Sequence, residues 1–204
     1  MSHRYLSTAR TAASVAGALV LAAAGLAGGA TPASAAYIVP PDCGPYSGFP
    51  VPAGYTRMDA VGVYVSTSSN NREFIIGTPA REVIVGSVYD DIICGLAGND
   101  DIKANTGDDI VYGGFHGDDI WGDLGNDNLH GDGGADTIHG DRFIGPSALD
   151  GNDRVDGGSN DDHLFGDKGV DTLVGGPGWD EGDCGPDAVI DDPRPTLDLP
   201  LNCP

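Results

Sequence analysis

Aspartates recur at a nine-residue step through the second half of this 204-residue chain. The step holds from Asp91 to Asp136, and it resumes at Asp153 after eight extra residues. Carboxylates in such numbers, at one spacing, indicate coordination of a hard cation that prefers oxygen ligands. The candidate metal ligands are Asp91, Asp100, Asp109, Asp118, Asp127, Asp136, Asp153, Asp162, Asp171 and Asp180.

Each of these aspartates is the sixth residue of a nonapeptide, as in GDLGNDNLH at 122–130 and GDGGADTIH at 131–139. Glycine is common at the first and fourth places, where a tight turn requires a backbone that other residues rarely adopt. The eighth place is aliphatic in nearly every unit between Gly86 and Asp183. The pattern predicts a turn followed by a short strand whose middle side chain points inward.

Two such units make one coil, so alternate strands should form two parallel sheets. Units two apart then stack, which brings Asp100 near Asp118 and Asp109 near Asp127. Neighbouring carboxylates repel unless a cation lies between them. Ca²⁺ accepts six to eight oxygen ligands in flexible geometry, whereas Mg²⁺ demands a tight octahedron and Zn²⁺ favours histidine and cysteine. The sequence therefore predicts several bound calcium ions.

The units resemble the haemolysin-type (RTX) calcium-binding nonapeptide, G-G-x-G-x-D-x-U-x with U aliphatic. The resemblance implies an all-β fold, a right-handed parallel β-roll whose glycine-rich turns bind calcium between coils. The catalytic domain that often accompanies such repeats is not expected in this chain. The chain departs from the pattern at Ala104 in the first place and at Tyr89, His116 and Asn160 in the fourth. Weaker or empty sites are expected at those turns.

Residues 1–35 read as a signal peptide, in which Arg4 and Arg10 precede an apolar run that ends in a small-residue cleavage motif. The roll is expected over 77–183, with an insertion at 142–149 and a degenerate first unit in which Glu82 and Ile84 keep the phase. Residues 36–76 are expected to form an N-terminal cap and the proline-rich residues 184–204 a C-terminal cap, because the exposed ends of a solenoid need cover.

Four cysteines lie beyond the signal segment, and an oxidising compartment permits them to pair in three ways. Cys94 occupies an outward ninth place, where the segment that carries Cys43 could lie across the roll. The preferred pairing is therefore Cys43–Cys94 with Cys184–Cys203, which makes the end caps disulfide-supported.

The net charge of −21 argues against nucleic acid as a partner, and no further apolar run is long enough to span a membrane. We expect no catalytic residues, since hydrolase and phosphate-binding motifs are lacking. His116, His130, His139 and His163 lie in turns or outward places and are expected to be surface residues.

The sequence predicts a secreted, non-enzymatic protein that folds on binding extracellular calcium and has a structural or buffering role. The alternative is a calcium-dependent adhesin-like module that binds a cell-wall glycan or a protein partner. Outward Tyr112 and Trp121, or the insertion at 142–149, are the candidate contacts for that alternative.

Overall fold

The computed structural model describes residues 43–48, 50–66, 71–141 and 151–185. Beyond one short 3-10 helix, η1 (Gly44–Tyr46), its regular elements are strands, and no helix among these residues is long and apolar enough to cross a membrane. The strands are β1 (Tyr55–Asp59), β2 (Val63–Val65), β3 (Arg72–Ile76), β4 (Val83–Val85), β5 (Ile92–Ala97), β6 (Asp101–Thr106), β7 (Ile110–Phe115), β8 (Asp119–Leu124), β9 (Asn128–Gly133), β10 (Thr137–Asp141), β11 (Arg154–Asp156), β12 (His163–Phe165), β13 (Thr172–Val174) and β14 (Glu181–Asp183).

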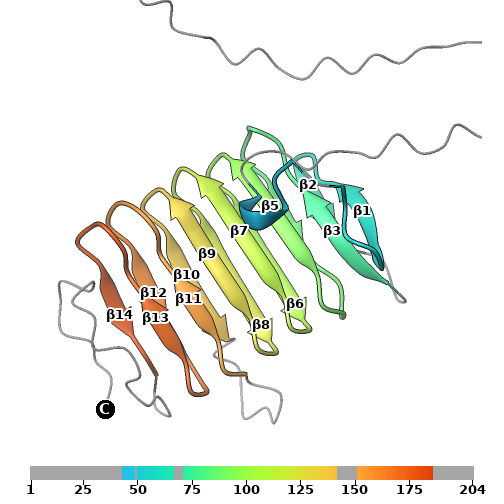
Figure 1. Ribbon diagram of the computed structural model, residues 1–204. Helices are drawn as coiled ribbons and strands as arrows, with labels where there is room; N and C mark the ends of the chain where they lie inside the picture. Colours follow the sequence, from blue (N-terminus) through green and yellow to red (C-terminus); the bar gives the residue numbers. More distant parts are fainter. Residues whose placement is uncertain (1–42, 49, 67–70, 142–150, 186–204) are drawn as a thin grey trace, which may run out of the picture. The chain divides into compact units, whose positions relative to one another are not determined.

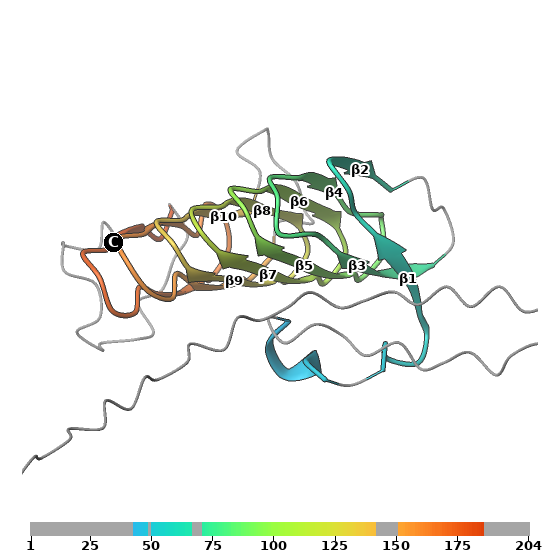
Figure 2. The ribbon, with the colours of Figure 1, turned by 90° about the horizontal axis from the view of Figure 1, so that it is seen from above.

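Successive strands alternate between two parallel seven-stranded sheets. One sheet has the order β1-β3-β5-β7-β9-β11-β13, and the other has the order β14-β12-β10-β8-β6-β4-β2. Strands of one sheet lie side by side along the array in Figure 1, and Figure 2 shows the two sheets facing each other. The predicted parallel β-solenoid is confirmed.

The eighth-place side chains form a single column of apolar residues between the sheets. Ile102 pairs in register with Ile120, and Ile120 with Ile138, and all three are fully buried. Leucine, isoleucine and valine fill the corresponding position in the opposite sheet, as at Val111 and Leu129. The thin core that the nonapeptide pattern predicts therefore runs the length of the array.

Strands in the middle of the array are longer than the three residues expected. β5 to β9 each span six residues, because pairing continues through the first places of the following unit, as in Leu96 with Gly114 and Asn105 with Asp123. The parallel coils also extend upstream into the range expected to cap the roll. β1 pairs with β3 and β2 with β4, so that Met58 and Tyr64 continue the inward column.

Residues 43–48 lie over the outer face of one sheet and are attached there by the Cys43–Cys94 disulfide, as preferred from the sequence. Cys43, Phe74, Ile76, Ile92 and Tyr112 form a second apolar cluster beneath them. Tyr112 was expected to be an exposed outward aromatic; instead, this cover leaves it 6% exposed.

Two other expectations concern parts of the chain beyond the described residues. Cys184 is buried, but Cys203 lies outside that range, and the Cys184–Cys203 pairing stays a prediction. The signal segment 1–35, the insertion at 142–149 and most of the C-terminal tail also lie outside it.

Candidate metal centre

All ten sixth-place aspartates are buried, at 0–3% exposure, although each carries a carboxyl group. They occupy the residue just before each strand, where the turn ends and the chain enters the sheet. This position places them along the two edges of the roll, one row for each edge. The charge has therefore been taken out of water, which is unfavourable without a compensating partner.

One oxygen of each carboxylate joins neighbouring coils. Asp118 Oδ1 accepts the backbone N–H of Asp100 at 2.8 Å, and Asp136 Oδ1 accepts that of Asp118 at 2.8 Å. On the other edge, Asp109 and Asp127 repeat the contact, with the Asp109 N–H donating to Asp127 Oδ1 at 2.8 Å. The sixth-place residues thus form two ladders, in which every coil donates to the next.

The ladders cross the eight-residue insertion without a change of geometry. The Asp127 N–H donates to Asp153 Oδ1 at 2.8 Å, and the Asp136 N–H donates to Asp162 Oδ1 at 2.9 Å, although 26 residues separate the partners. Sequence reasoning had paired aspartates only on either side of the insertion. The resumed phase at Asp153 was the signal that these two pairs also meet.

The second oxygen of the carboxylate has a different environment. Within the described residues, Oδ2 is buried and has no hydrogen-bond partner in seven of the aspartates: Asp100, Asp109, Asp118, Asp127, Asp136, Asp153 and Asp162. Buried oxygens that lack a donor are rare in native proteins, and each one indicates a ligand, a water or an ion.

The unpartnered oxygens lie over the first-place glycines. A Cβ added to Gly113 would come within 2.6 Å of Asp118 Oδ2 and 3.0 Å of the carbonyl oxygen of Gly131, one coil further on. At Gly95 the corresponding distances are 2.8 Å to Asp100 Oδ2 and 2.5 Å to the carbonyl oxygen of Gly113. Glycine leaves this space to oxygens from two coils, and a donor set made only of oxygen suits a hard cation such as Ca²⁺.

The pKa values of the aspartates are consistent with a cation site between the coils. Burial raises the pKa of Asp109 and of Asp153 to about 9, and the pKa of Asp118 to about 8. Hydrogen bonds from backbone N–H groups oppose the effect, while neighbouring carboxylates add to it, as Asp127 and Asp91 do at Asp109. A nearby cation would favour the charged form and reverse these shifts.

A comparison with protein-family models matches the RTX calcium-binding nonapeptide repeat in four copies, over residues 76–111, 95–129, 112–144 and 147–180. Together these copies cover half of the chain. The chain belongs to the RTX calcium-binding nonapeptide repeat family. No curated protein and no solved structure matches it significantly.

RTX repeats bind calcium, and the departures from the RTX pattern can now be placed. His116 and Asn160 stand where the pattern has its fourth glycine, and they take the same left-handed backbone, with φ of 81° and 87°. Tyr89 is not among the described residues with positive φ, and neither is Gly134, the fourth-place glycine of the unit at 131–139. Ala104 is fully buried in the central column.

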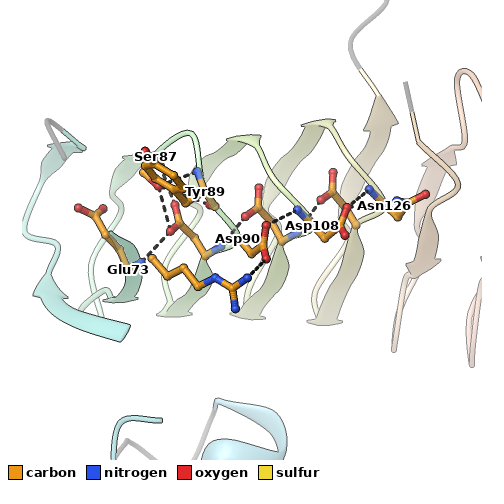
Figure 3. A network of polar contacts seen from close by, with 10 residues as sticks. Glu73, Ser87, Tyr89, Asp90, Asp108 and Asn126 are labelled. Atoms are coloured by element: carbon orange, nitrogen blue, oxygen red, sulfur yellow. Dashed lines mark hydrogen bonds and ion pairs between the residues drawn. The ribbon is translucent and has the colours of Figure 1, made fainter. Parts of the chain in front are cut away.

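A row of fifth-place side chains forms further contacts between coils beside the sixth-place ladders, and it was not expected from the sequence. Fifth-place side chains accept N–H groups from the following coil, as Asp90 Oδ1 does from Asp108 and Asp108 Oδ1 does from Asn126, at 3.2 and 2.9 Å. Figure 3 shows Asp90, Asp108 and Asn126 of this row. At the start of the row, Arg72 forms an ion pair with Asp90. Aspartate and asparagine recur in the fifth place of the RTX units, which is the signal that could have revealed it.

The histidines lie as expected, in a turn at His116 and on outward faces at His130, His139 and His163. His130 stacks on Tyr112, and His139 lies between Trp121 and Phe165, with ring planes parallel to within 6°. No group of three or more His, Cys, Asp or Glu side chains is arranged to hold a metal in the part of the chain that the structure describes.

Proposed function

We propose that this protein is a calcium-binding β-roll whose sixth-place aspartates hold Ca²⁺ between successive coils, and that binding drives the chain to fold. The observation that carries the proposal is the row of buried, unpartnered Oδ2 atoms, repeated coil by coil on both edges. Asp171 and Asp180 continue the two ladders of Oδ1 contacts at the C-terminal end, where their Oδ1 atoms accept the N–H groups of Asp153 and Asp162.

Calcium would supply the positive charge that the rows require. The chain's own residues supply the oxygens, orient the carboxylates through the Oδ1 contacts and exclude water by burial. A cation that binds only the coiled state stabilises it by mass action. Without the cation, the net charge of −21 and the buried carboxylates favour an open chain.

The role that best fits this site is structural or buffering, in a secreted protein, with calcium outside the cell as the trigger. The support for export is the leader-like composition of residues 1–35. A dissociation constant of roughly 10⁻⁴ to 10⁻³ M is typical of extracellular calcium modules.

The adhesin-like alternative has less support from the outward aromatic row. Trp121, His139 and Phe165 stack on one another, and Lys103 covers Trp121 at 4.9 Å from its ring centroid. A sugar that binds by stacking needs a free ring face, and both faces of Trp121 and of His139 are used within the row.

Circular dichroism during a calcium titration tests the proposed function. A β signal should appear with Ca²⁺, disappear with a chelator and fail to develop fully with Mg²⁺ at the same concentration. A full β signal that persists in strong chelator, or one that Mg²⁺ produces equally well, would overturn the proposal.

A further inference from the structure

The first three carboxylates of the two ladders differ from those that follow. Glu73, Glu82 and Asp91 hold the same ladder position, since the Glu73 N–H donates to Asp91 Oδ1 and the Glu82 N–H to Asp100 Oδ1, both at 2.7 Å. Their other contacts, however, come from side-chain hydroxyls and turn N–H groups of the protein itself.

Each of these carboxylates has a hydroxyl partner. Tyr64 Oη donates to Glu73 Oε2 at 3.0 Å, and the Thr78 hydroxyl donates to Glu82 Oε1. Ser87 Oγ donates to Asp91 Oδ1 at 3.1 Å. The Glu73 N–H and the Ser87 hydroxyl thus both donate to Asp91 Oδ1, and Figure 3 shows Glu73 and Ser87 with their contacts.

The turn backbone adds a second donor in the two units that have Thr78 and Ser87 in the second place. The Thr78 N–H donates to Glu82 Oε2 at 3.1 Å, and the Ser87 N–H donates to Asp91 Oδ2 at 2.6 Å. The oxygen that is unpartnered at Asp100 is therefore satisfied at Glu82 and Asp91.

The backbone changes conformation at the same point along the chain. From Leu96 onward, the second-place residues of the regular nine-residue units have positive φ, as at Leu96 (81°), Asn105 (90°), Asp123 (75°) and Asp132 (70°). Asp141, in the unit that carries the insertion, is not among them. Thr78 and Ser87 are not among the described residues with positive φ. The turns at 77–82 and 86–91 are thus closed by hydrogen bonds. The seven turns that end at Asp100, Asp109, Asp118, Asp127, Asp136, Asp153 and Asp162 instead present a carboxylate oxygen without a hydrogen-bond partner.

Two further features reinforce the same end of the roll. The Cys43–Cys94 disulfide and the second apolar cluster, with Phe74, Ile92 and Tyr112, lie on the outer face of β3, β5 and β7. Among the described residues, the coils after β7 contribute to the inner column and not to the second cluster.

We propose that the coils from Tyr55 to Cys94 fold without a cation, because hydroxyls of Tyr64, Thr78 and Ser87 take the place of the metal, and that they form the template on which calcium-dependent coils assemble from Leu96 onward. Asp91, which the repeat pattern groups with the metal ligands, is then held by hydrogen bonds. This inference rests on the proposed function, since it assigns calcium to the downstream turns.

Hydrogen exchange followed by mass spectrometry tests the template on the full chain with its disulfides intact. In chelator, peptides from 72–94 should be protected while those from 95–141 and 151–183 exchange freely. Excess Ca²⁺ should then protect the downstream peptides by at least about a hundredfold, the range expected for a saturated site.

The outcomes separate the two proposals. Free exchange of 72–94 in chelator, with protection appearing everywhere only in calcium, would overturn the template and leave the calcium function standing. Absence of any calcium-induced protection downstream would overturn the proposed function itself. Equal protection of both regions in chelator would overturn both.

Variants test the hydroxyls directly. The double variant Thr78→Val with Ser87→Ala should lower protection of 77–94 in chelator at least about tenfold for each hydrogen bond to a carboxylate that is lost. Thr78→Ser retains its hydroxyl and should retain the protection. Thr137→Val removes a hydroxyl from the outer face of β10 and serves as the matched control.

Tyr64→Phe tests the same idea with minimal risk to folding, because it removes one oxygen and keeps the ring. Protection of 72–76 in chelator should fall, while the calcium response of the downstream peptides stays unchanged. Unaltered protection in both the Tyr64 variant and the double variant would show that the hydroxyls do not replace the cation.

Discussion

At the scale of single residues, each sixth-place aspartate uses one carboxylate oxygen to bond a neighbouring coil and directs the other toward the turn in which it lies. Its position and burial follow from the nonapeptide pattern, because the residue that enters a strand after a glycine turn is held against the roll. The separate use of its two oxygens could not be predicted from the sequence. That division depends on the register between coils, which places the Asp100 N–H opposite Asp118 Oδ1 and leaves Oδ2 facing Gly113.

Replacing Asp118 by asparagine should have opposite effects with and without calcium. In chelator, Asp118→Asn removes a buried charge and should stabilise the coiled state, whereas in calcium it removes a ligand and should lower stability by about 1–3 kcal/mol. Urea unfolding in calcium and the β content by circular dichroism in chelator measure the two changes. Asp119→Asn is the control, since Asp119 is exposed on β8; a similar response from both variants would contradict the assignment.

Acid should partly substitute for calcium. The pKa of Asp109 is raised by burial to about 9 and that of Asp127 to about 7, whereas an unfolded aspartate titrates near 3.8. The coiled state therefore binds more protons than the open chain between these values, so its stability is greatest below about pH 4 and is lost as the pH rises.

Dichroism at pH 4.5 and pH 8 in chelator checks this dependence. More β structure is expected at pH 4.5, and the difference between the two pH values should shrink when calcium is present. A calcium-free chain that becomes more ordered as the pH rises would contradict the sign.

At the scale of elements, the repeating unit is a turn followed by a strand, and glycine determines where the turn can form. The inward column was predictable from the eighth places, and so was the alternation of strands between two sheets. The upstream coils were not, because β1, β2 and β3 follow turns that lack the glycine and aspartate signature. Their inward residues, such as Met58 and Tyr64, show no repeat that could be recognised without the register.

Gly125→Ala should prevent one turn from stacking. Gly125 has φ of 129°, and an added Cβ would overlap the carbonyl of Gly107 in the preceding coil. We expect a loss of about 3 kcal/mol in calcium, from backbone strain and displacement of the neighbouring turn.

Thermal unfolding in calcium measures that loss. Gly133→Ala is the matched control, because a Cβ there meets its nearest atoms at ordinary distances of 3.5–3.7 Å. Equal melting temperatures for the two variants would show that the close approach at Gly125 is easily relieved.

At the scale of the whole molecule, repulsion between negative charges destabilises the compact state and burial of the apolar core stabilises it. A net charge of −21 is distributed along a roll with one thin central column, so the compact state depends on what neutralises its edges. The family and the fold class could be predicted from the repeat alone. The uneven distribution of metal dependence could not, because it is set by three hydroxyls, that of Tyr64 upstream of the repeats and those of Thr78 and Ser87 where the pattern has its second glycine.

Small-angle scattering should detect the resulting change in size. After removal of residues 1–35, a fully unfolded chain would have a radius of gyration of about 43 Å and a compact one about 16 Å. Calcium should move the protein most of the way between these limits, while sodium chloride at equal ionic strength should not. Compaction by salt alone would indicate general screening of charge and contradict site binding.

The ladder contacts across 141–151 have a consequence for protein engineering. Coil-to-coil hydrogen bonds are 2.8–2.9 Å long whether 18 or 26 residues separate the partners. The stacking of the coils therefore does not depend on the residues inserted between Asp141 and Gly151. That junction is a natural place to graft a foreign peptide, which the metal would then present or withdraw together with the coil that carries it.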